Sequence, residues 1–301
     1  MTNSPYEVLA GLLRDQEASG ADLYAAACEV RECFVRSEHL IGLLPADAPR
    51  LLTAGLTRAG RAGVVEAWLE LGRLLAHGAA PWAPYPEQDV PASIEAYREA
   101  DRAGSLAGAL GWVRIAYFAT SAEHEQDAAR RLDELLAEHP ADPDVLLLSG
   151  YLRFRGYGHP ADPAAAVPFH RAAAEHGSGD AAFELSVLHA TGTGVPADDD
   201  ESMRWTMRAA ELGSVRAMGN LGYYYATGRG VEHDPAKALD WYGKAADAGH
   251  GKSAYTAGVM CLTGDGGLPV DERRAAEFFD LAEELGVDVD DHLDAMGLSR
   301  A

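Results

Sequence analysis

The stretch that decides the fold reads AMGNLGYYYATGRGVEHDPAKALDWYGKAADAG, residues 217–249. Its pattern returns along the chain at a spacing of about 36 residues. One step back, Leu221, Gly228, Gly230, Asp234 and Gly249 become Leu185, Gly192, Gly194, Asp198 and Gly213. A second step gives Gly156, Gly158, Asp162 and Gly177, and a step forward, with one extra residue after Gly266, gives Gly264, Gly266, Asp271 and Gly286. Periods of this size are typical of solenoids, so these four copies predict a repeat protein.

Within one copy, the residue spacing predicts two helices joined by a glycine turn. Leu221 and Tyr225 lie four residues apart and so share one face of a helix, and Trp241 and Ala245 do the same on a second helix. Gly228 is expected to end the first helix, because glycine accepts the left-handed conformation of a helix C-terminus.

The second helix of each copy has its own start signal. Asp234 is followed by Pro235, which is the pattern of an N-cap with proline at the first helical position. We expect Trp241 and its equivalent Trp205 to fill the space between neighbouring repeats. One helix pair cannot bury its apolar faces alone, so the copies must stack on one another.

These residues resemble the Sel1-like repeat, a relative of the tetratricopeptide repeat. The stretch 217–249 carries the whole family pattern. The other copies depart from it at Ser149, His170, Ser186, Glu201, Ser202, Thr206, Ala257, Cys261 and Gly267. The resemblance covers about residues 143–286. It implies an all-α fold, a right-handed superhelical solenoid of Sel1-like, tetratricopeptide-like helix pairs, and a role as an adaptor.

The rest of the chain divides around this array. Residues 1–60 read as an N-terminal helical cap, with helices expected at about 5–17, 22–38 and 49–58. Residues 61–142 read as degenerate tetratricopeptide-like helix pairs, 143–286 as the four Sel1-like repeats, and 287–301 as an acidic C-terminal cap or tail. Between two helices of the degenerate part lies Ala79–Pro91, rich in proline and aromatic residues. Such a loop is either functional or a stiff surface connection.

Composition and charge disfavour several classes of function. The net charge is −22 at pH 7, with no basic stripe, which disfavours binding to nucleic acid or to an anionic membrane. Surface charge of this kind serves solubility, and it would also steer a basic partner toward the protein. The three cysteines form no CxxC pair, no apolar run approaches a membrane span of about 18 residues, and the start lacks a basic signal-peptide region. We therefore expect a cytoplasmic protein.

No catalytic, cofactor or metal motif stands out. Residues 246–253, ADAGHGKS, fit a loose P-loop pattern, but a P-loop follows a buried strand and here a helix is expected. The histidines show no HExxH spacing, so no metal site is expected, and we expect no cofactor and no enzyme activity.

The candidate site is the surface formed by the first helix of each pair, which lines the concave groove of tetratricopeptide-like solenoids. The positions that would face this groove are Tyr151, Arg155, Phe183, Val187, Arg216, Tyr223, Tyr255 and Val259. Aromatic and arginine side chains anchor protein interfaces. A periodic aromatic stripe can equally be core between repeats.

The sequence thus favours a scaffold that binds a protein or peptide, with an inhibitor or immunity-type protein for a basic partner as a narrower form. The alternative is an enzyme or small-molecule sensor built on a helical scaffold.

Overall fold

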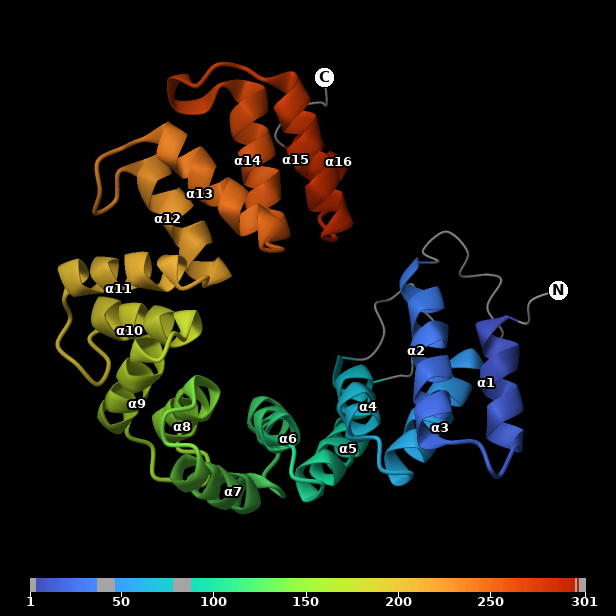
Figure 1. Ribbon diagram of the computed structural model, residues 1–301. Coiled ribbons are helices and arrows are strands. Elements are labelled where there is room, and N and C mark those ends of the chain that lie inside the picture. Colours follow the sequence, from blue (N-terminus) through green and yellow to red (C-terminus); the bar gives the residue numbers. More distant parts are fainter. Residues whose placement is uncertain (1–3, 37–46, 78–87, 296, 298–301) are drawn as a thin grey trace. The chain divides into compact units, whose positions relative to one another are not determined.

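The computed structural model describes residues 4–36, 47–77, 88–295 and 297, and among these residues it contains helices and turns but no β-strand (Figure 1). The all-α fold of stacked helix pairs that the repeat predicts is confirmed. Contacts divide the chain into two compact units. The first comprises Met1–Glu138 with Tyr157–His159, and the second His139–Gly156 with Pro160–Ala301.

The first unit is built from seven helices among its described residues. They are α1 (Pro5–Arg14), α2 (Gly20–Arg36), α3 (Ala48–Arg61), α4 (Val65–His77), α5 (Val90–Arg102), α6 (Leu106–Phe118) and α7 (Glu125–Glu138). Helices α1 to α4 share one core, in which Leu9, Leu23, Leu52 and Leu56 are fully buried. Arg58 of α3 closes the end of α1, because its guanidinium donates to the carbonyl oxygens of Leu12 and Leu13 at 3.1 Å each.

The end of α1 and the start of α2 differ from the predicted bounds. The second helix was expected to start at about residue 22, but Gly20 is the first residue of α2. The signal is Ser19, whose hydroxyl accepts from the Asp22 backbone N–H at 3.1 Å and donates to the Asp22 carboxylate at 2.7 Å. Such a pairing caps the N-terminus of a helix and so begins α2. Helix α1 ends at Arg14, before the predicted end at about residue 17.

The second unit is more regular. Its helices are α8 (Pro143–Arg155), α9 (Pro163–Glu175), α10 (Gly179–Thr191), α11 (Asp199–Glu211), α12 (Val215–Thr227), α13 (Pro235–Asp247), α14 (Gly251–Thr263), α15 (Glu272–Glu284) and α16 (Val289–Ala295), with a short 3₁₀ turn η2 (Asp265–Gly267). Each helix from α8 to α15 spans 13 residues. In Figure 1 they follow one another as a stack of pairs, each first helix beside its own second helix.

The turns within each pair obey the predicted rules. Gly228 ends α12 in the left-handed conformation, with φ 69°. The Asp234 side chain accepts from the Lys237 backbone N–H at 3.0 Å and so begins α13. The same two devices recur in the other pairs, at Gly156 and Asp162, Gly192 and Asp198, and Gly264 and Asp271.

In three of the four pairs of the second unit, a glycine of the first helix faces a ring of the second. A Cβ atom added to Gly222 of α12 would lie 2.6 Å from Cδ1 of Tyr242 on α13, so only glycine fits beside this ring. The same contact forms between Gly150 and His170, between Gly258 and Phe279 and, in the first unit, between Gly72 and Tyr97. Tyr242 is buried at 8% exposure, whereas Trp241, which was expected to fill the space between neighbouring repeats, is half-buried.

The α10–α11 pair of the second unit has no such contact between a glycine and a ring. At the equivalent positions of α10 and α11, Ser186 and Thr206 replace the glycine and the ring, and both are buried. The Ser186 hydroxyl donates to the Phe183 carbonyl at 2.7 Å, and the Thr206 hydroxyl to the Ser202 carbonyl at 2.9 Å. A larger residue on the first helix thus accompanies a smaller one on the second, and neither hydroxyl lacks a hydrogen bond.

Two predicted segments lie partly outside the described residues. Of Ala79–Pro91 the structure describes only 88–91, where Gln88 donates to the Ala76 carbonyl at 2.8 Å and Asp89 begins α5. Of the tail 287–301, the described part contains α16, whose Val289 and Leu293 pack into the C-terminal core.

Replacing Gly222 by alanine is expected to lower the free energy of unfolding by about 1–3 kcal/mol, because the new methyl group would overlap the Tyr242 ring. Gly243 of α13 is the matched control, since a Cβ there would meet its nearest atom, Cζ of Phe278, at 3.6 Å. Gly243→Ala should be neutral or stabilise by up to about 1 kcal/mol through helix propensity. Urea unfolding of both variants measures the difference, and equal effects would contradict the constraint.

Candidate functional site

The predicted site residues lie on the first helices of the four pairs, α8, α10, α12 and α14. We call this surface the first-helix face. Within each helix the chosen positions are four or seven residues apart, as Phe183 and Val187 are on α10, and Arg216 and Tyr223 on α12. Residues at these spacings share one side of a helix, so the repeat aligns them along neighbouring helices.

Three of the helices are joined on this face by a polar cluster. Glu184 of α10 accepts two hydrogen bonds at the same oxygen, Oε1, from the Tyr151 hydroxyl of α8 at 3.0 Å and from the Arg216 guanidinium of α12 at 2.9 Å. Arg216 also lies over the ring of Phe183, 4.4 Å from its centroid. We call Tyr151, Phe183, Glu184 and Arg216 the α10 clamp, because α10 supplies its central residues.

The clamp is more buried at one end than at the other. Burial, and then the negative charge of Glu184, raise the pKa of the Tyr151 hydroxyl above its ordinary value, so Tyr151 remains a neutral donor. The Arg216 side chain is 51% exposed, while that of Glu184 is 21% exposed. Arg216 therefore retains donor groups toward solvent while one edge is held by Glu184.

Beside the clamp lie two exposed apolar side chains. Val187 is 38% exposed and Tyr223 is 48% exposed, and few large apolar residues of the described chain are as open. Arg155, at the end of α8, is also exposed. The first-helix face thus combines a fixed arginine with open aromatic and aliphatic surface, which is the composition of interface anchors.

The residues of α14 take a different place. Tyr255 packs against Phe279 of α15, with ring centroids 6.1 Å apart, and against His292 of α16 at 5.3 Å. Val259 is half-buried and belongs to the C-terminal core. The structure therefore brings Tyr151, Phe183 and Arg216 together, leaves Val187 and Tyr223 open, and uses Tyr255 and Val259 partly in packing.

Sequence reasoning missed Glu184, the centre of the clamp. Glu184 follows Phe183 directly and aligns by the repeat with Leu148, Asn220 and Thr256, so no periodic signal marks it. Its role arises from neighbours 33 residues before it and 32 after it. One acidic residue between two helices that carry tyrosine and arginine is the signal that could have indicated it.

His170 lies directly behind this face. Its side chain is 2% exposed, its ring packs on Gly150 and meets the Tyr151 ring edge-on at 5.5 Å, and its Nδ1 has no hydrogen-bond partner among the described residues. Burial lowers the pKa of His170 from 6.5 to about 4. His170 is therefore a neutral ring that replaces Tyr242 or Phe279 in its pair.

The described residues contain no group of three or more histidine, cysteine or acidic side chains placed to hold a metal ion. Residues 246–253 connect α13 to α14, so a helix and not a strand precedes their glycines. Within the described ranges, no helix has both the length and the apolar character needed to cross a membrane.

Comparison with known proteins identifies the repeats. The family model described as the Sel1 repeat matches residues 145–178, 179–214, 215–250 and 252–287. No curated protein matches the sequence.

Several solved structures are similar to this chain. The Sel1 repeat protein from Oxalobacter formigenes is 25% identical, with a TM-score of 0.59 over 97% of this chain and 85% of that one. A protective antigen of uropathogenic Escherichia coli that displays an SLR fold is 21% identical, with a TM-score of 0.50 over 97% of this chain and 63% of that one. An immunity protein from Pseudomonas aeruginosa is 17% identical, with a TM-score of 0.45 over 94% of this chain and 87% of that one.

The burial of His170 predicts a pH-dependent stability. Between pH 6.5 and about 4 the unfolded chain binds a proton at this histidine and the folded chain does not, so stability falls as the pH falls through this window. The shift corresponds to about 3 kcal/mol when complete. His170→Phe, which copies Phe279 of the last pair, should remove this contribution. Urea unfolding at pH 7 and pH 4.5 measures it, and parallel losses in the two chains would contradict the assignment.

Proposed function

We propose, on the premise that residues 145–287 belong to the Sel1 repeat family, that this chain is a protein-binding scaffold and that its first-helix face is the docking surface. Binding, not catalysis, is the activity in this proposal. The supporting observation is the α10 clamp with Val187 and Tyr223 beside it. Side chains that are held in place before binding lose little conformational entropy when a partner docks.

The chemistry of the face suggests how a partner is held. Tyr223 and Val187 offer apolar area at its centre, and Arg216 offers donors to a carbonyl or carboxylate of the partner. The contact of the Arg216 guanidinium with the Phe183 ring, 4.4 Å from the ring centroid, helps to hold it in place. An arginine fixed in this way is a rigid contact, in contrast with a solvated lysine.

The surrounding charge supports a partner with a basic surface. With a net charge of −22, the chain attracts cationic proteins over distances of about a Debye length, roughly 8–10 Å at physiological salt. A role as an inhibitor or immunity-type protein against a basic effector is the narrower form of this proposal, and it rests on this charge. The compartment we propose is the cytoplasm, because Cys28, Cys33 and Cys261 are all free thiols.

The proposal predicts that Tyr223→Ala weakens the binding of a partner but leaves the stability of the fold nearly unchanged. A partner is first captured by a photo-crosslinking residue at position 223. Position 270 is the control, because Val270 lies outside the first helices and is 59% exposed. The purified partner should then bind Tyr223→Ala at least about fivefold more weakly, a loss of about 1 kcal/mol or more. The free energy of unfolding should change by less than about 1 kcal/mol, because this side chain is half exposed.

A partner captured equally at positions 223 and 270, or bound equally by wild type and Tyr223→Ala, would contradict docking on the first-helix face. Arg216→Met is a second variant. It keeps much of the apolar stem over Phe183 but removes the charge, and it should also weaken binding if the guanidinium contacts the partner.

A further inference from the structure

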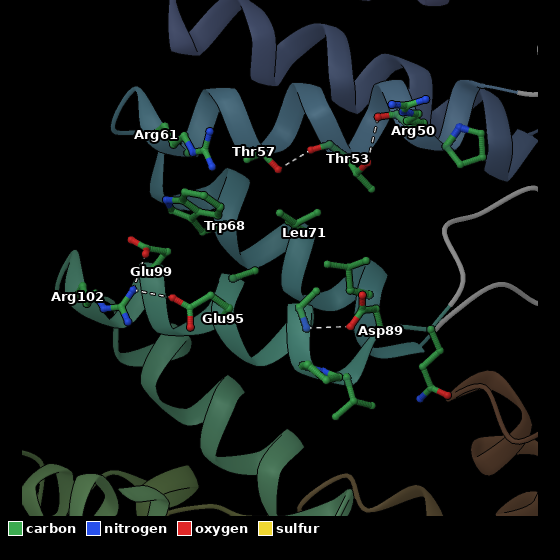
Figure 2. Close-up of a pocket in the computed structure, with 18 of the residues that line it drawn as sticks. Arg50, Thr53, Thr57, Arg61, Trp68, Leu71, Asp89, Glu95, Glu99 and Arg102 are labelled. Atoms are coloured by element: carbon green, nitrogen blue, oxygen red, sulfur yellow. Dashed lines mark hydrogen bonds and ion pairs between the residues drawn. The ribbon is translucent and has the colours of Figure 1, made fainter. Parts of the chain in front are cut away.

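A groove of about 1430 Å³ lies in the first unit, between α3 and α5, with α4 as its floor (Figure 2). It involves none of the residues of the first-helix face. Its volume exceeds the roughly 300–1,000 Å³ of pockets that hold small molecules. The groove is therefore sized for a segment of polypeptide.

The wall formed by α3 is a single stripe of side chains. Arg50, Thr53, Thr57 and Arg61 follow one another three or four residues apart and face the groove together, as Figure 2 shows. The opposite side of α3, with Leu52 and Leu56, is buried in the core. The stripe is thus fixed in direction by the packing of α3.

The floor is apolar. Trp68, Leu71 and Leu75 of α4 lie between the two walls, and Ala96 of α5 adds to this surface. Gly60 of α3 leaves room for the indole, since a Cβ there would lie 2.5 Å from Cε2 of Trp68. Trp68 is therefore held flat against α3 and is only half-buried.

The two walls differ in charge. On α5, Arg102 forms ion pairs with Glu95, at 2.8 Å, and with Glu99, so the charges of that wall are largely paired among themselves. On α3, neither Arg50 nor Arg61 makes an ion pair or a side-chain hydrogen bond with a described residue, and both are exposed. The α3 wall is therefore positive through Arg50 and Arg61, whereas the α5 wall carries Glu95 and Glu99 against the single Arg102.

We propose that this groove binds an amphipathic helix of a partner protein, with its apolar stripe on Trp68, Leu71 and Leu75 and acidic side chains along the edge that faces Arg50 and Arg61. A helix suits the groove because its backbone hydrogen bonds are internal, and the helical walls offer no sheet edge for an extended strand. The two arginines are 11 residues apart on α3, which corresponds to about 16 Å, or three helical turns. Acidic residues about 11 positions apart on the bound helix match this spacing.

The test is a selection from a display library of 16-residue helical peptides, stapled on one side and randomised on the other, with the full chain as target. Enriched peptides should carry apolar residues at i, i+3 or i+4, and i+7, with Asp or Glu along one edge. The double variant Arg50→Glu, Arg61→Glu should bind these peptides at least tenfold more weakly by fluorescence anisotropy. It should bind versions of the same peptides with Lys in place of the acids better than wild type does.

Two further variants make the result decisive. Thr57→Trp places an indole in the middle of the groove and should abolish binding with the melting temperature unchanged. Arg171→Glu, at an exposed arginine of α9 without a described ion pair, is the charge control and should bind like wild type. The proposal is overturned if no peptide is enriched, if the enriched peptides lack the acidic edge, or if Thr57→Trp binds as wild type does. Self-association that depends on Arg61 would also overturn it, because the occupant would then be a second copy of this chain.

Discussion

The contact between a backbone glycine and a side-chain ring sets the geometry of three of the four helix pairs in the second unit. Gly150, Gly222 and Gly258 let the rings of His170, Tyr242 and Phe279 lie directly on a helix backbone. This close contact fixes where the second helix crosses the first. The crossing in turn determines the length of the turn and how the next pair packs. Gly72 and Tyr97 make the same contact in the first unit, where the sequence pattern is degenerate. The packing rule therefore extends further along the chain than the family pattern does.

Arginine is used in three ways in this protein. Arg58 closes a helix end by donating to carbonyl oxygens of α1. Arg216 joins two elements of the second unit through Glu184 and a ring contact with Phe183. Arg50 and Arg61 make no described ion pair. A guanidinium is always charged and presents several donors in a plane, so these differences come from the surroundings and not from the residue. Arg58 and Arg216 have bonding partners within the fold, whereas Arg50 and Arg61 have no ion-pair partner among the described residues.

The sequence predicted the repeats well because their signals are local. Gly228, Asp234 and Pro235 each determine the conformation of the adjacent backbone, and such signals can be read without knowledge of the neighbours. The first-helix face was predicted as a set of positions, yet the cluster depends on Glu184, which has no periodic equivalent. The sequence marked Trp241 as a residue between repeats, but it gave no sign that Tyr242 is the ring that packs on Gly222. The groove between α3 and α5 had no signal at all, since Arg50, Trp68 and Glu95 come from three helices and meet only after folding.

The Ser186 and Thr206 pair has a consequence for how such repeats diverge. Placing a serine opposite an aromatic ring overfills the contact, whereas placing a threonine opposite a glycine leaves a small space that the surrounding side chains can partly close. The two single-substitution intermediates therefore differ in stability. The less destabilising order replaces the ring by threonine first and the glycine by serine second. In the reverse direction, the serine must be replaced by glycine before the threonine can be replaced by a ring. The two positions are therefore coupled, because the residue at one limits the size of the residue that the other can hold.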